Sequence, residues 1–243
     1  MRMNAGKGLV PAVCVAACIG LVGAGATLAV GSDAGELEAL RLKVEKAQTA
    51  ADAAPEDVGA AVVLAEALAE QALWLRENHN PGWKDIANAA LQRAEGAYEA
   101  RQDVSTMLAL ARVWAARGSF GKAIDYAEDA VEAGPADPKA HIGLGDVLAQ
   151  RGRAIVASRW RLGRITRNRI TAAADAALEA YGKALVAAQA GEMKALAHLR
   201  MGSVYLDLLG DEETADSQWR SAIKAAPDSD TAERAKDLLA QFE

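Results

Sequence analysis

The chain has 243 residues, of which 51% are hydrophobic and only 5% aromatic, and its formal net charge is −6 with a pI near 5.3. This balance excludes a general electrostatic attraction to nucleic acid, and the abundance of alanine favours closely packed helices over sheets. The two cysteines, Cys14 and Cys18, both lie in the N-terminal apolar run, which leaves the rest of the chain without a disulfide or a thiolate site.

The first 31 residues are predicted to be a membrane anchor or signal segment. Gly8–Val30 contains 23 residues without a charge and follows Arg2 and Lys7, and about 20 apolar residues suffice for a helix to cross a bilayer. We expect a single-pass anchor in a bacterial inner membrane, with the C-terminal domain in the periplasm. Two alternatives stay open. One is a cleaved signal and a secreted protein; the other is a lipoprotein, because Val15-Ala-Ala-Cys18 resembles a lipobox and Cys18 would be acylated.

The next two segments are expected to be helical. Residues 32–54 are predicted to form a juxtamembrane helix and a linker. A helix is then predicted from Pro55 to Asn78, with the proline at its start and Glu56 and Asp57 in its first turn. A polar loop leads into a returning helix at 83–100, so that residues 55–103 form a degenerate helical pair.

A sharper helical pair follows at Val104–Asp137. Gly118 separates two amphipathic stretches, and Pro135 prevents the second from continuing. The stretches carry apolar or small side chains on one face each: Leu110, Ala111 and Trp114 in the first, and Phe120, Ala123, Ile124, Ala127, Ala130 and Val131 in the second. One such pair cannot bury both apolar faces alone, so stacked neighbours are expected.

Two further copies of this pattern are present. A shift of 34 residues brings Leu110, Ala111, Trp114 and Gly118 onto Leu144, Gly145, Leu148 and Gly152. A third copy contains Met201, Gly202, Tyr205, Gly210, Ala215, Trp219, Ala222 and Pro227. The period, the small residues and the closing proline resemble the tetratricopeptide repeat (TPR) family over residues 104–229. The resemblance implies an all-α, right-handed solenoid of antiparallel helix pairs, similar to bacterial membrane-anchored TPR scaffold proteins. Residues 230–243 are predicted to form a C-terminal capping helix.

The second copy carries an insertion of about 20 residues, at 153–172. Residues 151–169 contain seven arginines and no acid. Because apolar residues alternate with the arginines, we expect longer helices rather than a loose loop, with the turn at Leu162-Gly163. The end of this basic hairpin would carry Arg159, Trp160, Arg161, Arg164, Arg167 and Arg169. Arginine with an aromatic neighbour suits anionic partners, so the alternative function is electrostatic binding of anionic lipid, nucleic acid or an acidic protein.

No catalytic motif is recognisable, and we expect neither a cofactor nor a bound metal nor a small-molecule substrate. Gly143-Leu-Gly145 lies within a predicted helix and lacks the strand and the third glycine of a nucleotide-binding loop. His141 and His198 are about one repeat apart and are expected to pack or to cap helices rather than share a metal. An enzyme is therefore not predicted.

The resemblance places a partner protein on the concave face, which the first helix of each repeat lines. Carrying this face over by motif gives Leu108, Arg112, Lys139, Ile142, Asp146, Leu196, Leu199, Ser203, Leu206 and Asp207. This mainly apolar lining suits an amphipathic helix, and the chain's own helix at 33–50 is the competing occupant. The predicted function is a non-enzymatic, membrane-anchored scaffold or adaptor in an envelope complex. Nucleic acid is not an expected partner of the groove.

Overall fold

The computed structural model describes residues 32–158 and 163–241, which contain ten α-helices, one short π-helix and no strand. The chain divides into two compact units, residues 1–39 and 40–243, and the description below concerns the second. The elements are α1 (Ser32–Ala53), α2 (Val58–Glu77), α3 (Trp83–Ala100), α4 (Val104–Ala116), α5 (Phe120–Ala133), α6 (Pro138–Ala157), α7 (Gly163–Ala187), α8 (Gly191–Val204), the π-helix η2 (Tyr205–Leu209), α9 (Glu212–Ala225) and α10 (Asp230–Leu239).

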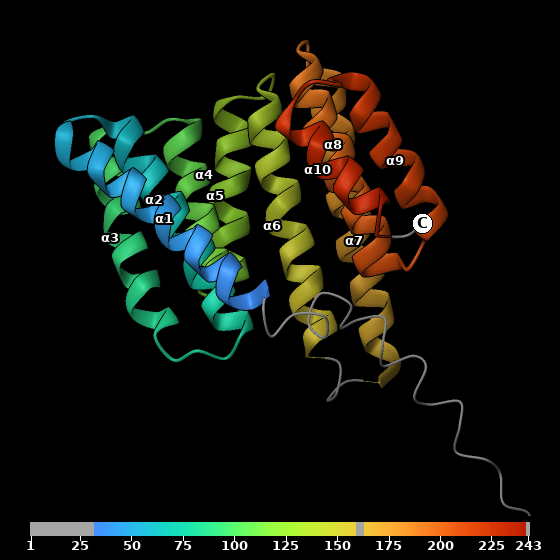
Figure 1. Ribbon diagram of the computed structural model, residues 1–243, viewed down its shortest axis with the longest axis horizontal. Coiled ribbons are helices and arrows are strands. Elements are labelled where there is room, and N and C mark those ends of the chain that lie inside the picture. Colours follow the sequence, from blue (N-terminus) through green and yellow to red (C-terminus); the bar gives the residue numbers. More distant parts are fainter. Residues whose placement is uncertain (1–31, 159–162, 242–243) are drawn as a thin grey trace, which may run out of the picture. The chain divides into compact units, whose positions relative to one another are not determined.

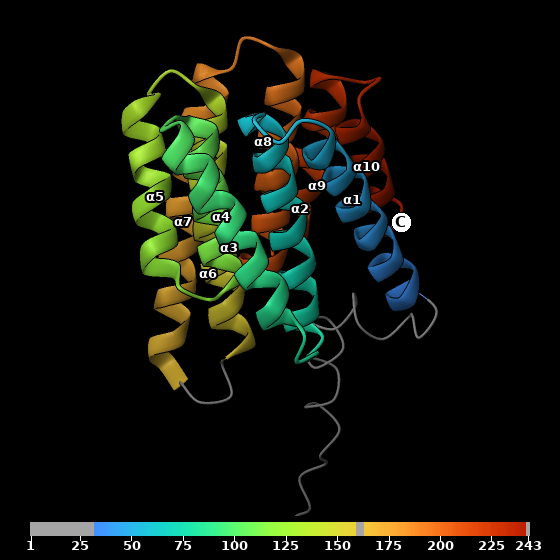
Figure 2. The ribbon, with the colours of Figure 1, turned by 90° about the vertical axis from the view of Figure 1, so that its left-hand side faces the viewer.

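Consecutive helices form antiparallel pairs, because the connections between them are only a few residues long (Figures 1 and 2). The pairs are α2–α3, α4–α5, α6–α7 and α8–α9, and α10 packs on the last pair. The first helix of each pair also contacts the first helix of the next pair, and the second helix contacts the next first helix. This arrangement is a helical solenoid, as the sequence predicted.

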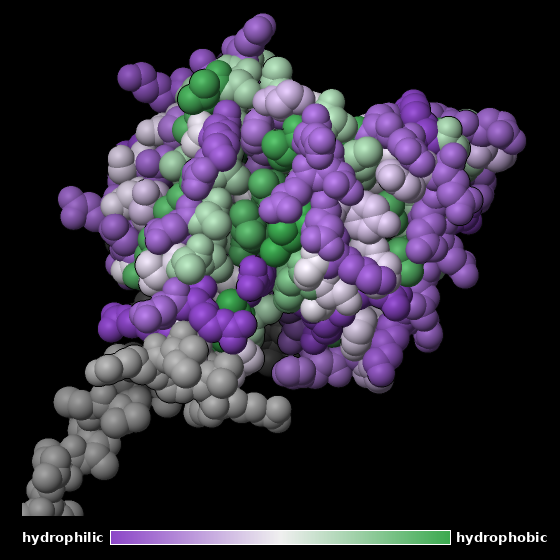
Figure 3. Space-filling view, turned by 180° about the vertical axis from the view of Figure 1, so that it is seen from behind, coloured by the Kyte–Doolittle hydropathy of each residue, from purple (hydrophilic) through white to green (hydrophobic). Residues whose placement is uncertain are grey.

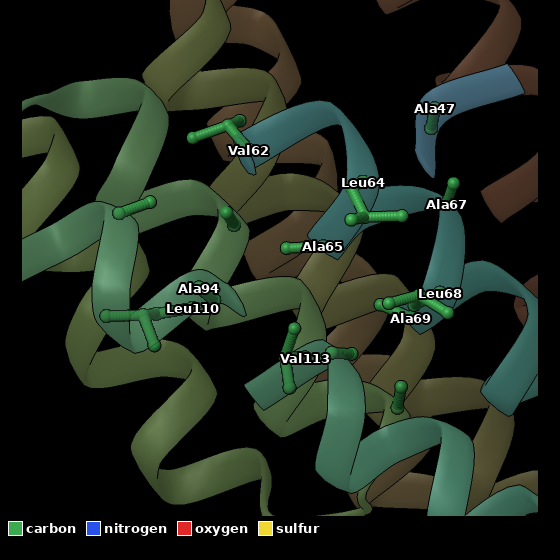
Figure 4. Packing of buried hydrophobic residues seen from close by; sticks show 14 of the residues in the cluster. Ala47, Val62, Leu64, Ala65, Ala67, Leu68, Ala69, Ala94, Leu110 and Val113 are labelled. Carbon is green, nitrogen blue, oxygen red and sulfur yellow. The ribbon is translucent and has the colours of Figure 1, made fainter. Parts of the chain in front are cut away.

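Alanine allows these helices to approach closely. In the largest hydrophobic cluster, Leu64, Leu110 and Val113 interleave with alanines of α1, α2, α3 and α4 (Figure 4). Ala47 of α1 and Ala67 of α2 point toward one another in this cluster. The face seen from behind carries a band of apolar atoms between polar flanks (Figure 3).

Glycines take the place of alanine where an aromatic ring crosses the first helix. A Cβ atom on Gly145 would come within 2.5 Å of the Tyr181 ring, and one on Gly202 would overlap the Trp219 ring. Both rings are almost completely buried. The small residues of the repeat pattern are therefore explained by close packing.

The ends of two helices depend on single residues, and one of them corrects an expectation. The helix expected from Pro55 begins instead at Val58, because Asp57 caps it: the Asp57 carboxylate accepts a hydrogen bond of 2.8 Å from the Gly59 N–H. Gly152, which aligns with Gly118, does not end its helix. Gly118 has a positive φ of 79°, whereas Gly152 is buried within α6, where a Cβ would come within 2.6 Å of Leu208 Cδ1.

The pair α6–α7 is longer than its neighbours. It contains 20 and 25 residues, against 13 in α4 and 14 in α5. At a rise of about 1.5 Å per residue, the excess of α6 corresponds to about 10 Å and that of α7 to about 16 Å. The hairpin therefore projects beyond the preceding pair at the end where α6 finishes (Figure 1).

Among the described helices, α2 is long and apolar enough to cross a membrane, but half of that stretch is buried in the unit. Its buried face packs against α3 and α4, so the apolar character of α2 is that of a core helix. The anchor predicted at Gly8–Val30 lies outside the described residues.

Candidate protein-binding face

Three leucine and isoleucine side chains predicted to line an open groove lie in the core instead. Leu108, Ile142 and Leu199 are only 4%, 3% and 3% exposed. Leu108 packs on the backbone of Gly143, where a Cβ would overlap the leucine side chain, and Leu199 packs on Trp219. The prediction of an apolar groove is wrong for these residues, because closely spaced helices cover the side chains at their crossings.

Four other predicted groove residues make local contacts or are exposed. Leu196 and Leu206 are half-buried against the cluster around Trp219. The Ser203 hydroxyl donates a 3.2 Å hydrogen bond to the Leu199 carbonyl within α8. Lys139 is exposed in the first turn of α6 and adds a charge, not an apolar surface, to this helix.

Charged side chains lie along the first helices of successive pairs, and most of them form ion pairs between these helices. We call this set the charged face; its members are Glu66 and Glu70 of α2, Arg112 of α4, Asp146 and Arg153 of α6, Arg200 of α8 and Asp207 of η2. It includes two of the predicted groove residues, Arg112 and Asp146. Asp207 was also placed on this face by the repeat motif, and the other four members were not predicted there.

Each ion pair of the charged face connects two helices. Arg112 pairs with Glu66, Arg153 Nη1 lies 3.0 Å from Asp207 Oδ2, and Arg200 Nε lies 3.2 Å from Asp146 Oδ1. The side chains in these pairs are between 22% and 41% exposed. The Arg112–Glu66 and Arg153–Asp207 pairs have enough solvent access that each contributes only about 0–1 kcal/mol to stability, so a partner can rearrange these two at little cost to the fold. The Arg200–Asp146 pair differs, because the Nε atom of Arg200 is buried.

A buried tyrosine fixes the centre of this face. The Tyr181 hydroxyl, on α7, donates a 2.9 Å hydrogen bond to Asp146 Oδ1. Burial, followed by the charge of Asp146, raises the pKa of Tyr181 well above its ordinary value. Asp146 is also the main reason that the pKa of Arg200 is raised. Tyr181 therefore keeps its proton and Arg200 its charge, and together they hold the Asp146 carboxylate in place.

The residues of α1 extend this pattern at one edge. Lys43 pairs with Glu70, and both side chains are more than half exposed. Val44, Ala47 and Ala51 pack into the cluster formed with α2. Within residues 40–53, the apolar face of α1 therefore packs against α2.

The architecture is similar to that of solved repeat proteins. TTC0263, a TPR protein of Thermus thermophilus, is similar with a TM-score of 0.54 and 17% identity, over 87% of this chain and 96% of that one. The chain has the tetratricopeptide-repeat fold. A human IFIT1 dimer with m7Gppp-AAAA has a TM-score of 0.54 and 17% identity over 79% of this chain, and a monomeric IFIT1 mutant with Gppp-AAAA has 0.56 and 17% over 91%.

These similarities establish the fold and nothing finer. The chain covers only 38% and 47% of the two IFIT1 chains. No protein-family model matches the sequence, and no curated protein matches it. A helical repeat protein with the TPR fold is suited to protein interaction, because its stacked first helices present a continuous surface.

The ion pairs of the charged face connect neighbouring repeats, at sequence separations longer than the 34-residue period. Arg112 and Glu66 are separated by 46 positions, and Arg153 and Asp207 by 54. Opposite charges on the first helices of neighbouring repeats are the sequence signal for these pairs. The repeat motif does not specify charged positions, so it does not indicate which charges meet.

Each of the two histidines in the TPR repeats makes its own polar contact, and the two do not share a partner. His141 Nε2 lies 2.8 Å from the Pro135 carbonyl oxygen, and His198 Nδ1 lies 2.8 Å from Gln218 Oε1. In the part of the chain that the structure describes, no three His, Cys, Asp or Glu side chains are grouped to hold a metal ion.

The basic hairpin is described in part. Arg167 and Arg169, on the first turns of α7, are exposed. Arg159, Trp160 and Arg161 lie outside the described residues, as does the side chain of Arg164. Cys18, the predicted lipidation site, also lies outside them.

Proposed function

We propose that this protein is a non-enzymatic scaffold that binds a partner protein through its charged face while residues 8–30 anchor it in a bacterial membrane. The observation that carries the proposal is the set of partly exposed ion pairs that join first helices of successive TPR repeats. Such pairs add little to stability, yet they place both signs of charge at fixed positions along one surface.

The charge pattern defines the partner. The charged face contains four acids and three arginines, so it is nearly neutral and carries both signs of charge. A partner segment with both acidic and basic side chains can form ion pairs with these residues in place of the ion pairs within the protein. Electrostatic complementarity of this kind contributes more to specificity than to affinity. An apolar amphipathic helix, the partner suggested by the sequence, suits this surface less well.

The anchor completes the proposal. The 23 uncharged residues of Gly8–Val30 are long enough to cross a bilayer, and Arg2 and Lys7 favour the cytoplasm for the short N-terminal segment. The scaffold would then face the periplasm and organise an envelope complex. Sodium carbonate extraction of membranes tests this part: the protein should stay in the pellet. Release of the protein, or an N-terminus beyond residue 31 in a soluble fraction, would contradict it.

A charge exchange tests the binding face. In Glu66→Arg with Arg112→Glu, the internal ion pair can re-form with its direction reversed, so the fold should be kept while the pattern offered to a partner changes. The matched control is Glu179→Lys with Lys183→Glu, an exposed pair within α7. Affinity capture from detergent-solubilised membranes should lose the partner with the first exchange and retain it with the second. Equal capture by both variants would refute the charged face as the binding surface.

A further inference from the structure

The α6–α7 hairpin presents an excess of positive charge at one end of the TPR unit. Residues 151–169 contain seven arginines and no acid. Arg151, Arg167 and Arg169 are exposed, and no ion pair engages them within the described residues. Arg153 is different, because it pairs with Asp207 of the charged face. The two helices are held together by Val156 and Ile170, which pack into the neighbouring cluster, so the arginines extend from a rigid support.

The hairpin also reaches further than the turns beside it. With α6 longer than α4 by about 10 Å and α7 longer than α5 by about 16 Å, the end of the hairpin stands clear of the α4–α5 turn. Arg167 and Arg169 lie in the extended part of α7. A surface approaching this end of the unit would meet these side chains before it met the preceding turn.

The chain enters the unit at the same end. α1 is antiparallel to α2, which is shown by the short connection at 54–57 and by the pairing of Lys43 with Glu70. α2 and α6 run in the same direction, since each is followed by a returning helix. The Leu40 end of α1 and the Ala157 end of α6 therefore lie at one end of the helices (Figures 1 and 2).

Only nine residues separate Val30, the last residue of the uncharged run, from Leu40. Because residues 32–39 belong to α1, this length of chain spans about 15 Å as a helix. We propose that the Arg151, Arg167 and Arg169 end of the hairpin binds the anionic lipid headgroups of the membrane that holds residues 8–30. The inference rests on the anchoring part of the proposed function.

Proximity favours lipid over other anions. A tethered surface is present at a high effective concentration, and a basic side chain near an anionic leaflet contributes about 1 kcal/mol, which corresponds to about a five-fold factor in binding. Three arginines therefore supply a factor on the order of 100. The arginine guanidinium matches phosphate with two parallel hydrogen bonds. The hairpin would fix the orientation of the scaffold relative to the bilayer.

The test places a fluorophore at each end of α6 in the full chain. Ala157→Cys and Ala136→Cys are introduced separately into a Cys14→Ser, Cys18→Ser background, since both alanines are exposed and lie next to opposite ends of the helix. The protein is reconstituted into vesicles of phosphatidylcholine, alone or with phosphatidylglycerol, that carry a headgroup quencher. Quenching at Ala157 should appear only with phosphatidylglycerol and should weaken as salt is raised. The label at Ala136 should stay unquenched.

The charge variant and three contrasting results make the test decisive. Arg151→Gln with Arg167→Gln and Arg169→Gln should reduce quenching at Ala157 to the level in neutral vesicles, while circular dichroism shows an unchanged fold. Absent quenching in a protein that resists carbonate extraction would overturn the inference and leave anchoring intact. Release by carbonate would instead show that anchoring fails, and the inference would fall with it. A label that responds to soluble glycerol phosphate, nucleic acid or polyglutamate but not to vesicles would also overturn it.

Discussion

Gly145 permits the most demanding test of how the TPR helices pack. It lies on α6 opposite the Tyr181 ring of α7, and a Cβ there would sit 2.5 Å from Cε1 and 2.8 Å from Cδ1 and Cζ. Tyr181 is 1% exposed, and its hydroxyl is held by Asp146. The ring cannot move aside by rotating into solvent, so Gly145→Ala must displace one helix or strain the tyrosine.

The magnitude follows from two opposing effects. Alanine stabilises a helix interior by about 1 kcal/mol relative to glycine, whereas overpacking a core costs about 1–3 kcal/mol. For contacts as short as those at Tyr181 we expect the upper part of that range, and a net loss of about 1–2 kcal/mol. Gly182, on α7, is the matched control, because a Cβ at this position meets nothing within 4 Å. Gly182→Ala should stabilise the protein by about 0.5–1 kcal/mol.

Thermal unfolding followed by circular dichroism measures the difference. A gap of about 1.5–3 kcal/mol between the two variants corresponds to about 3–12 °C in Tm for a domain of this size. The double variant Gly145→Ala with Tyr181→Ala should lose less than the sum of its parts, since the first TPR repeat pairs Ala111 with the small Ala127 at the same place. A Gly145→Ala protein that melts at or above Gly182→Ala would refute the packing account.

Three further changes should have defined effects. Tyr181→Phe removes the hydroxyl that is hydrogen-bonded to Asp146 and should lower the free energy of unfolding by about 1.5–3 kcal/mol near neutral pH. The pKa of Tyr181 is raised in the folded protein, whereas tyrosine in the unfolded chain ionises near pH 10. The wild-type protein should therefore lose stability relative to the variant as pH rises above about 10. Arg76→Gln breaks hydrogen bonds from Nη1 to the Ala115 and Ala116 carbonyls at the end of α4, at 3.2 and 2.5 Å, and should lower the free energy of unfolding by about 1.5–3 kcal/mol in urea titrations. Leu199→Glu places a charge at a 3% exposed position and should lower Tm by about 10 °C or more, whereas an unchanged Tm would show that Leu199 is not in the core.

The fold could be predicted because its determinants are local or periodic. Trp83–Ala100 and Val104–Ala116 have the bounds that apolar spacing and glycine placement indicated. Gly145 and Gly202 recur at one place in the TPR motif, where close crossing demands a small residue. The start of α2 differs from the prediction because Pro55 takes the second position of a turn that is closed by a 3.0 Å hydrogen bond from the Asp57 N–H to the Ala54 carbonyl, and Asp57 then caps the helix.

The binding face was harder to predict, because it depends on how much of the first helix of each pair is covered by the neighbouring helices. Leu108 and Leu199 occupy motif positions that usually face a groove, yet the crossings at Gly143 and Trp219 bury them. The pairing of Arg153 with Asp207 spans 54 positions and depends on the length of the inserted hairpin. Spacing alone could not fix these contacts.

Site-specific photo-crosslinking in intact membranes tests the scaffold account most directly. A photoreactive amino acid replaces Glu66 or Asp207 of the charged face in one pair of proteins, and Glu179 of α7 or Asp216 of α9 in another. The account predicts that one partner protein is crosslinked from both positions of the charged face and from neither outer position. A partner crosslinked from Glu179 or Asp216, and not from Glu66 or Asp207, would contradict it.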